Sequence, residues 1–160
     1  YLEVIRSKTA KLFEASARVG AICAGAHPAL EQACAAYGQA LGTAFQVVDD
    51  VLDYTGDPEV TGKQVGDDLN EGKPTLPLIH TMTAGSTEDA ALVKQSLSDK
   101  SSEHLSEVIA AVRRSGGIEY TQNQAVEHQR KALAGLALVG ASPAKDALVA
   151  LAELAVARNR

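Results

Sequence analysis

The chain has 160 residues, of which 46% are hydrophobic, 22% are charged and only 4% are aromatic. Such a composition supports one domain with an aliphatic, alanine-rich core and excludes an intrinsically disordered chain. The net charge of −5 argues against a nucleic-acid partner, and no apolar run approaches the ~20 residues that span a bilayer. We expect a cytoplasmic protein, since no signal peptide opens the chain and Cys23 and Cys34 lie in apolar stretches typical of buried, reduced thiols.

Apolar residues recur with a helical period along nearly the whole chain, and no stretch alternates as a strand would. The pattern therefore predicts an all-α fold. Proline at Pro28 suits a first helical turn, Gly56 and Pro58 end the long helix that follows, and Ser86 and Ser142 are candidate N-caps. The expected helices cover residues 2–25, 29–55, 75–84, 88–98, 102–115, 118–139 and 143–157.

A stripe of carboxylates lies near the end of the second expected helix. Gln46, Asp49, Asp50 and Asp53 are spaced so that they share one helical face. Three like charges near a helix C-terminus repel one another and oppose the macrodipole, so a cation should compensate them. Mg²⁺ fits best, because it prefers carboxylate, water and phosphate oxygens, and no His or Cys accompanies the acids as zinc would require. The alternative is a solvated acidic face, which the flanking valines and the glycine-rich segment that follows make less attractive.

Lysines provide a second indication of chemistry. Lys8, beside Thr9, is the only charge on the apolar arc of the first helix, where it could either reach past its neighbours to water or bind an anion in a cavity. Lys63 and Lys73 each follow a glycine in the long connection at 56–74, where a mobile ammonium group could approach phosphate oxygens. Solvation alone could also explain two loop lysines, but with metal-binding acids nearby they indicate a diphosphate. The four histidines, His27, His80, His104 and His128, show no metal spacing and are expected to be structural or surface residues.

Four ordered motifs together resemble a known family. They are KTAKLF from Lys8, GTAFQVVDDVLDY from Gly42, the Gly62–Lys63 pair, and GDDLNEGKPTLP from Gly66. They are similar to the trans-isoprenyl (polyprenyl) diphosphate synthases, and most of all to the bacterial octaprenyl diphosphate synthases that supply a quinone side chain. The resemblance implies that residues 1–160 form the C-terminal half of one synthase domain, as part of the isoprenoid-synthase helical bundle.

The resemblance also implies a reaction. In this family an allylic diphosphate loses pyrophosphate to give an allylic cation, the double bond of isopentenyl diphosphate attacks that cation, and a proton leaves. It implies a homodimer in the cytoplasm, with a lipophilic product passed to the membrane. The implied Mg²⁺ ligands are Asp49, Asp50 and Asp53, the implied contacts to the allylic diphosphate are Lys8, Thr9, Gln46, Lys63 and Lys73, and the implied catalytic residues are Lys8, Asp49 and Lys63.

One departure from the family concerns activity. The chain opens at Tyr1 without Met and carries one aspartate-rich helix, whereas the family also needs an earlier DDxxD motif and an upstream basic set for isopentenyl diphosphate. We therefore expect a fragment that is inactive by itself. A non-catalytic subunit or dimerisation module of the same fold is the alternative, and the GDDLNEGKPTLPL run argues against a terpene cyclase.

Overall fold

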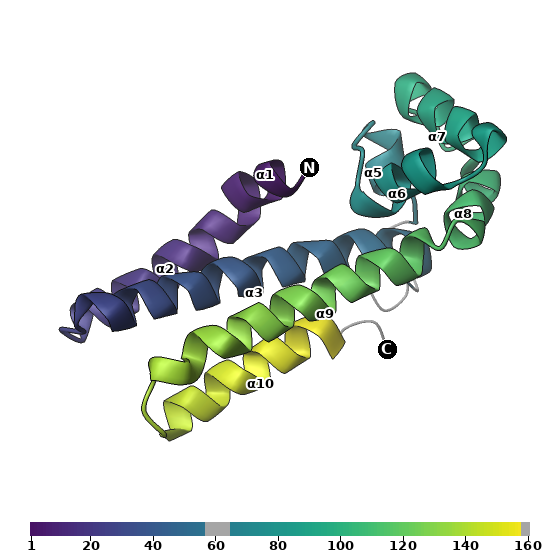
Figure 1. Cartoon of the computed structure of the whole chain (residues 1–160). Coiled ribbons are helices and arrows are strands. Elements are labelled where there is room, and N and C mark those ends of the chain that lie inside the picture. Colours follow the sequence, from purple (N-terminus) through teal and green to yellow (C-terminus); the bar gives the residue numbers. More distant parts are fainter. Residues whose placement is uncertain (57–64, 158–160) are drawn as a thin grey trace. The chain divides into compact units, whose positions relative to one another are not determined.

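The computed structural model describes residues 1–56 and 65–157, and this part of the chain contains helices and turns but no strand. The all-α prediction is confirmed. Figure 1 shows the helices in chain order. Their bounds are α1 Leu2–Ile5, a π-helical turn Arg6–Ala10, α2 Lys11–Cys23, α3 Pro28–Thr55, α5 Asp67–Asn70, α6 Leu76–Ala84, α7 Thr87–Asp99, α8 Leu105–Arg114, α9 Gly117–Gly135, a 3₁₀ turn Leu136–Leu138 and α10 Pro143–Ala157.

The chain divides into two compact units, which we describe separately. The long-helix unit contains residues 2–48 together with the chain from Gln124 onward, and the short-helix unit contains Tyr1 and residues 49–123. No helix in the described ranges is long and apolar enough to cross a membrane.

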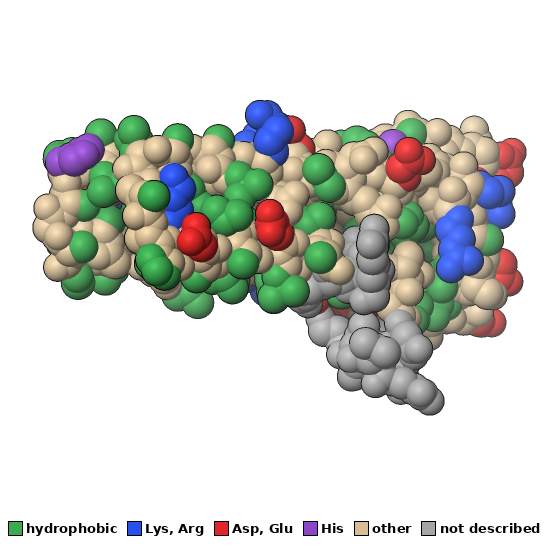
Figure 2. All heavy atoms as spheres, turned by 90° about the horizontal axis from the view of Figure 1, so that it is seen from below, with side chains coloured by type: hydrophobic (Ala, Val, Ile, Leu, Met, Phe, Trp, Pro, Cys, Tyr) green, Lys and Arg blue, Asp and Glu red, His purple; other side chains and the backbone are tan. Residues whose placement is uncertain are grey.

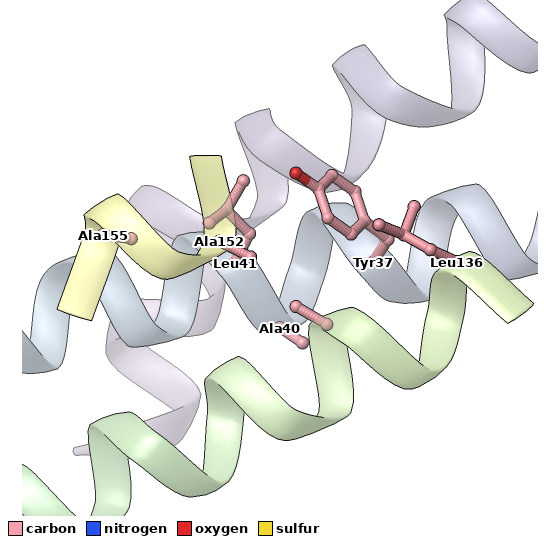
Figure 3. Close-up of a cluster of buried hydrophobic side chains, with 7 residues drawn as sticks. Tyr37, Ala40, Leu41, Leu136, Ala152 and Ala155 are labelled. Carbon is pink, nitrogen blue, oxygen red and sulfur yellow. The ribbon is translucent and has the colours of Figure 1, made fainter. Parts of the chain in front are cut away.

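The core of the long-helix unit is built from small side chains around one tyrosine. Tyr37 is buried and its hydroxyl donates to the Leu148 carbonyl oxygen at 2.8 Å, which ties α3 to α10. Because most of its neighbours are alanines, the helix backbones can pack closely. Figure 3 shows this cluster, which consists of Tyr37, Ala40, Leu41, Ala132, Leu136, Ala152 and Ala155.

Glycines on α3 allow α2 to approach it in the same unit. A Cβ added at Gly42 would lie 2.7 Å from the Cα of Ala10, and one added at Gly38 would overlap the main chain of Phe13. The rings of Phe13 and Phe45 lie beside this contact, with centroids 5.7 Å apart. The stripe of small residues on α3 is therefore a helix-packing surface.

The short-helix unit has a separate core of larger aliphatic side chains. Its α7 begins as the sequence predicts, since the Ser86 hydroxyl accepts the Asp89 N–H at 3.1 Å. The Asp89 side chain pairs with Arg114 at 2.5 Å and so links α7 to α8. The buried cluster consists of Tyr54, Leu69, Leu78, Val93, Val108 and Val112.

The first helix differs most from expectation. A π turn occupies Arg6–Ala10, and its wider winding shifts the helical phase that the apolar arc assumed. Apolar residues on both sides of the π turn are exposed: Leu12 is 72% exposed and Val4 61%, and Cys23, expected to be a buried thiol, is exposed as well. Exposed hydrophobic side chains also occur elsewhere: Figure 2 shows several of them, interspersed with charged groups, on the face seen from below. The short helix α5, within the expected loop, is the other element that periodicity did not predict.

Candidate diphosphate and metal site

Helix α3 positions the predicted acids by burying its apolar side. Val47, Val48 and Val51 are completely buried, as their spacing predicts. The acids are not a solvated face, however, because Asp50 is only 2% exposed and Asp53 only 6%. Burying carboxylates costs free energy unless hydrogen bonds or cations compensate, so this part of the helix is built to hold negative charge away from water.

Asp50 is held by the first residue of the chain. The Tyr1 hydroxyl donates a hydrogen bond to Oδ2 of Asp50. Burial and the charges of Asp50, Asp68 and Asp49 raise the pKa of the Tyr1 hydroxyl well above its usual range, so it stays protonated and remains a donor. No sequence pattern singled out Tyr1, because it precedes the first helix and belongs to none of the motifs.

Asp53 accepts hydrogen bonds from the segment that follows α3. Its Oδ2 atom accepts the Asp68 N–H at 3.3 Å, and its carbonyl oxygen accepts the Gly66 N–H at 3.0 Å. Burial raises the pKa of the Asp53 carboxyl to about 7, and the charge of Asp68 adds to that rise, while the Asp68 N–H opposes it. A cation bound nearby would compensate the negative charges of Asp53 and Asp68 and would lower the pKa of Asp53.

Lys73 lies in the same unit and is held by acids of its own segment. Its Nζ is 3.4 Å from Oδ1 of Asp68 and also pairs with Glu71. The hydrogen bond that Lys73 donates to the Glu71 carboxylate is the main reason that the pKa of Lys73 is raised, so the group stays cationic. Asp68 and Glu71 are therefore the acids that hold the ammonium group of Lys73.

The long-helix unit holds three other predicted residues. The Thr9 hydroxyl donates to Oε1 of Gln46 at 2.9 Å, which brings together two of the predicted substrate contacts. Lys8 and Thr9 both lie in the π turn, a conformation found frequently at functional sites. Lys8 is exposed, so its ammonium group is available to an anion.

Two further predictions concern Lys63 and the histidines. Lys63 lies outside the described residues. His80 stacks on Tyr120 with centroids 4.3 Å apart and bonds the Ser115 carbonyl oxygen at 3.1 Å, which agrees with a structural role.

The donor chemistry fits a hard divalent cation. Across residues 1–56 and 65–157 there is no group of three or more His, Cys, Asp or Glu side chains arranged to hold a metal unaided. Mg²⁺ does not require one, because it commonly takes one or two carboxylates and completes its shell with waters and phosphate oxygens. The candidate oxygen ligands for such a site are the carboxylates of Asp49, which is half-buried, and of Asp50 and Asp53, which are buried.

Comparison with known proteins identifies the family. A family model described as polyprenyl synthetase matches residues 1–114. Octaprenyl diphosphate synthase from Escherichia coli (strain K12) is 47% identical over 161 residues, which cover 100% of this chain and 50% of that protein. The all-trans-nonaprenyl-diphosphate synthase (geranyl-diphosphate specific) of Rhodobacter capsulatus is 40% identical and is covered over 48% of its length.

Solved structures agree. A polyprenyl synthase from Caulobacter crescentus CB15, complexed with calcium and isoprenyl diphosphate, matches with a TM-score of 0.92 and 38% identity over 100% of this chain and 49% of that one. The chain belongs to the polyprenyl synthetase family, as the four sequence motifs predict. It spans about half the length of the curated relatives it matches.

Proposed function

We propose that this chain is the C-terminal half of a Mg²⁺-dependent trans-polyprenyl diphosphate synthase and binds the diphosphate of the allylic substrate. One observation carries the proposal: in the aspartate-rich stretch of α3, the carboxylates of Asp50 and Asp53 are only 2% and 6% exposed, a burial of negative charge that bound cations would compensate. The ordered cation of Lys73 in the same unit adds a group suited to phosphate oxygens. The 47% identity to octaprenyl diphosphate synthase supports an octaprenyl product for the quinone side chain.

In this proposal the residues act on the leaving group. Asp49 and Asp50 would hold Mg²⁺, with Asp49 as the principal ligand. When bound, the metal stabilises negative charge on the departing pyrophosphate. Lys73 would donate to this diphosphate, and the family resemblance assigns Lys8 and Lys63 to it as well. The attraction of such ammonium groups strengthens as the C–O bond breaks, so they lower the barrier selectively.

The steps that follow loss of pyrophosphate also need residues from the other half of the full-length enzyme. The allylic cation is attacked by the double bond of isopentenyl diphosphate and the adduct loses a proton. Thr9 and Gln46, already hydrogen-bonded to each other, orient the allylic diphosphate. The isopentenyl diphosphate site and the first DDxxD motif would come from the other half of the full-length enzyme, which we propose to be a cytoplasmic homodimer that passes its product to the membrane.

Substitution of Asp49 tests the proposal. In the full-length protein, Asp49→Ala should lower the incorporation of radiolabelled isopentenyl diphosphate by at least about 100-fold. Without Asp49 the metal that would stabilise the negative charge on the departing pyrophosphate is no longer held in place. Glu103→Gln, an exposed acid of the same unit, is the control and should keep activity. The 160-residue chain assayed alone should show no turnover.

A non-catalytic subunit of the same fold makes the opposite prediction. If Asp49→Ala left the activity of the full-length protein unchanged, the scaffold alternative would be correct. Turnover by the 160-residue chain alone would contradict the claim that the other half is required.

A further inference from the structure

Asp53 is the third aspartate of the motif, yet its contacts are those of an anchor for the chain that follows. Both of its acceptor groups receive main-chain N–H donors from one short segment: the carbonyl oxygen from Gly66 at 3.0 Å and Oδ2 from Asp68 at 3.3 Å. Asp50 is also buried and accepts a hydrogen bond from the Tyr1 side chain, but Asp53 differs from it because its donors are main-chain N–H groups of the segment that leads to Lys73. The geometry of Asp53 is that of a hydrogen-bond acceptor that fixes the start of α5.

The anchored segment continues directly to Lys73. The Lys73 N–H donates to the Asp68 carbonyl oxygen at 2.8 Å, and the Lys73 ammonium group lies 3.4 Å from Oδ1 of Asp68. Asp68 therefore contacts Asp53 through its own N–H and Lys73 through its carbonyl and its side chain. Displacement of Asp68 would move the backbone of Lys73 and remove one of the two acids that its ammonium group contacts, the other being Glu71.

The surroundings leave little freedom for another arrangement. Gly66 has a φ of +89°, a conformation that side chains disfavour, and a Cβ added there would lie 2.5 Å from Leu105. Leu69 of α5 is completely buried in the core of the short-helix unit. The segment is thus fixed by packing on one side and by Asp53 on the other.

We propose that Asp53 is a positioning residue that aligns Lys73 through Asp68, and that it is not itself a metal ligand. This inference rests on the proposed function, because it assigns Lys73 to the substrate diphosphate. It revises the role that the motif resemblance gives to Asp53 and leaves the metal to Asp49 and Asp50.

A pair of variants separates the two roles. An amide oxygen can accept the Asp68 N–H but is a poor substitute for an anionic Mg²⁺ ligand, whereas alanine can do neither. Binding of inorganic pyrophosphate with MgCl₂ is measured by calorimetry on the full-length protein and on its Asp53→Asn and Asp53→Ala variants. We expect Asp53→Asn to stay within about threefold of the unmodified affinity and Asp53→Ala to lose at least about tenfold, or about 1.4 kcal/mol.

A double-mutant cycle tests whether the effect passes through Lys73. In a Lys73→Gln background, Asp53→Ala should weaken pyrophosphate binding by less than about twofold, because the group it positions is already gone. Circular dichroism and amide exchange accompany each variant, and the Asp68 amide should stay protected in Asp53→Asn. If Asp53→Ala does not fold, the Asp53→Asn measurement alone still decides between the roles.

The outcomes are distinct. Loss of at least tenfold in Asp53→Asn would show that the negative charge is needed, and the positioning role would be wrong. Unchanged affinity in a folded Asp53→Ala, or an effect that persists in full without Lys73, would also overturn it. If the unmodified protein bound no magnesium pyrophosphate at all, the proposed function itself would fail.

Discussion

Asp53→Asn should stabilise the metal-free protein at neutral and alkaline pH. Burial raises the pKa of this carboxyl from 3.8 to about 7 in the folded chain. Since the folded state holds a proton that the unfolded state releases between about pH 4 and pH 7, the free energy of unfolding falls as pH rises across that window and levels off above it. The asparagine keeps the acceptor for Asp68 but never ionises.

The size of the stabilisation expected from Asp53→Asn follows from how far the pKa of Asp53 is raised in the folded chain. At about 1.4 kcal/mol per pH unit the cost of ionising Asp53 is at most about 4 kcal/mol. Screening by water and relaxation of Asp68 reduce it, so we expect Asp53→Asn to gain about 1–2 kcal/mol above pH 7.5. For a protein of this size that is a rise in Tm of roughly 2–8 °C.

Urea unfolding at pH 5 and at pH 8 provides the assay. The stabilisation by Asp53→Asn should be full at pH 8 and much smaller at pH 5, where most of the native carboxyl is already protonated. Glu103→Gln, at an exposed acid of the same unit, should change the free energy of unfolding by less than about 0.5 kcal/mol at both pH values. Destabilisation by Asp53→Asn at pH 8, or a gain independent of pH, would refute the reasoning.

Three further substitutions test the packing. Gly42→Ala should cost about 2–3 kcal/mol, because the new Cβ would lie 2.7 Å from the Cα of Ala10, and thermal unfolding would show the loss; an unchanged Tm would mean that α2 can move aside. Tyr37→Phe removes the donor to Leu148 and should cost about 1 kcal/mol in urea titration, whereas a stability gain would contradict that role. Ser86→Ala removes the N-cap of α7 and should also cost about 1 kcal/mol, with Ser86→Asp expected to recover most of it.

Periodicity and helix-end residues were sufficient to predict most of the fold. The spacing of Val47, Val48 and Val51 predicted the buried side of α3, and Pro28 and Ser142 predicted where helices begin. These predictions are confirmed because burial and helix capping depend on the type of side chain, which can be read from the sequence. The side-chain pattern did not indicate the π turn, because a π turn differs from an α-helix only in its backbone hydrogen bonds.

The candidate site was predicted only in its residue types. The acids and Lys73 were identified from spacing, and the 2.9 Å contact of Thr9 with Gln46 joins two predicted residues. The anchoring of Asp53 by Asp68 could not be predicted, because the donor is a main-chain N–H, which every residue except proline carries. Chain connectivity through a long glycine-rich segment also gives no indication of which N–H will meet which carboxylate.

The π turn at Arg6–Ala10 has a consequence for how this helix tolerates length changes. Removing one residue from the turn would let the chain close into regular α-helix, which advances about 100° per residue. Because the π turn holds one residue more than the α-helical turn that would replace it, Leu2–Ile5 would keep nearly the same orientation about the helix axis relative to α2, and Ile5 would keep its buried position. A single-codon deletion in the π turn should therefore be far less damaging than one inside α2, where all preceding residues would rotate by about 100°.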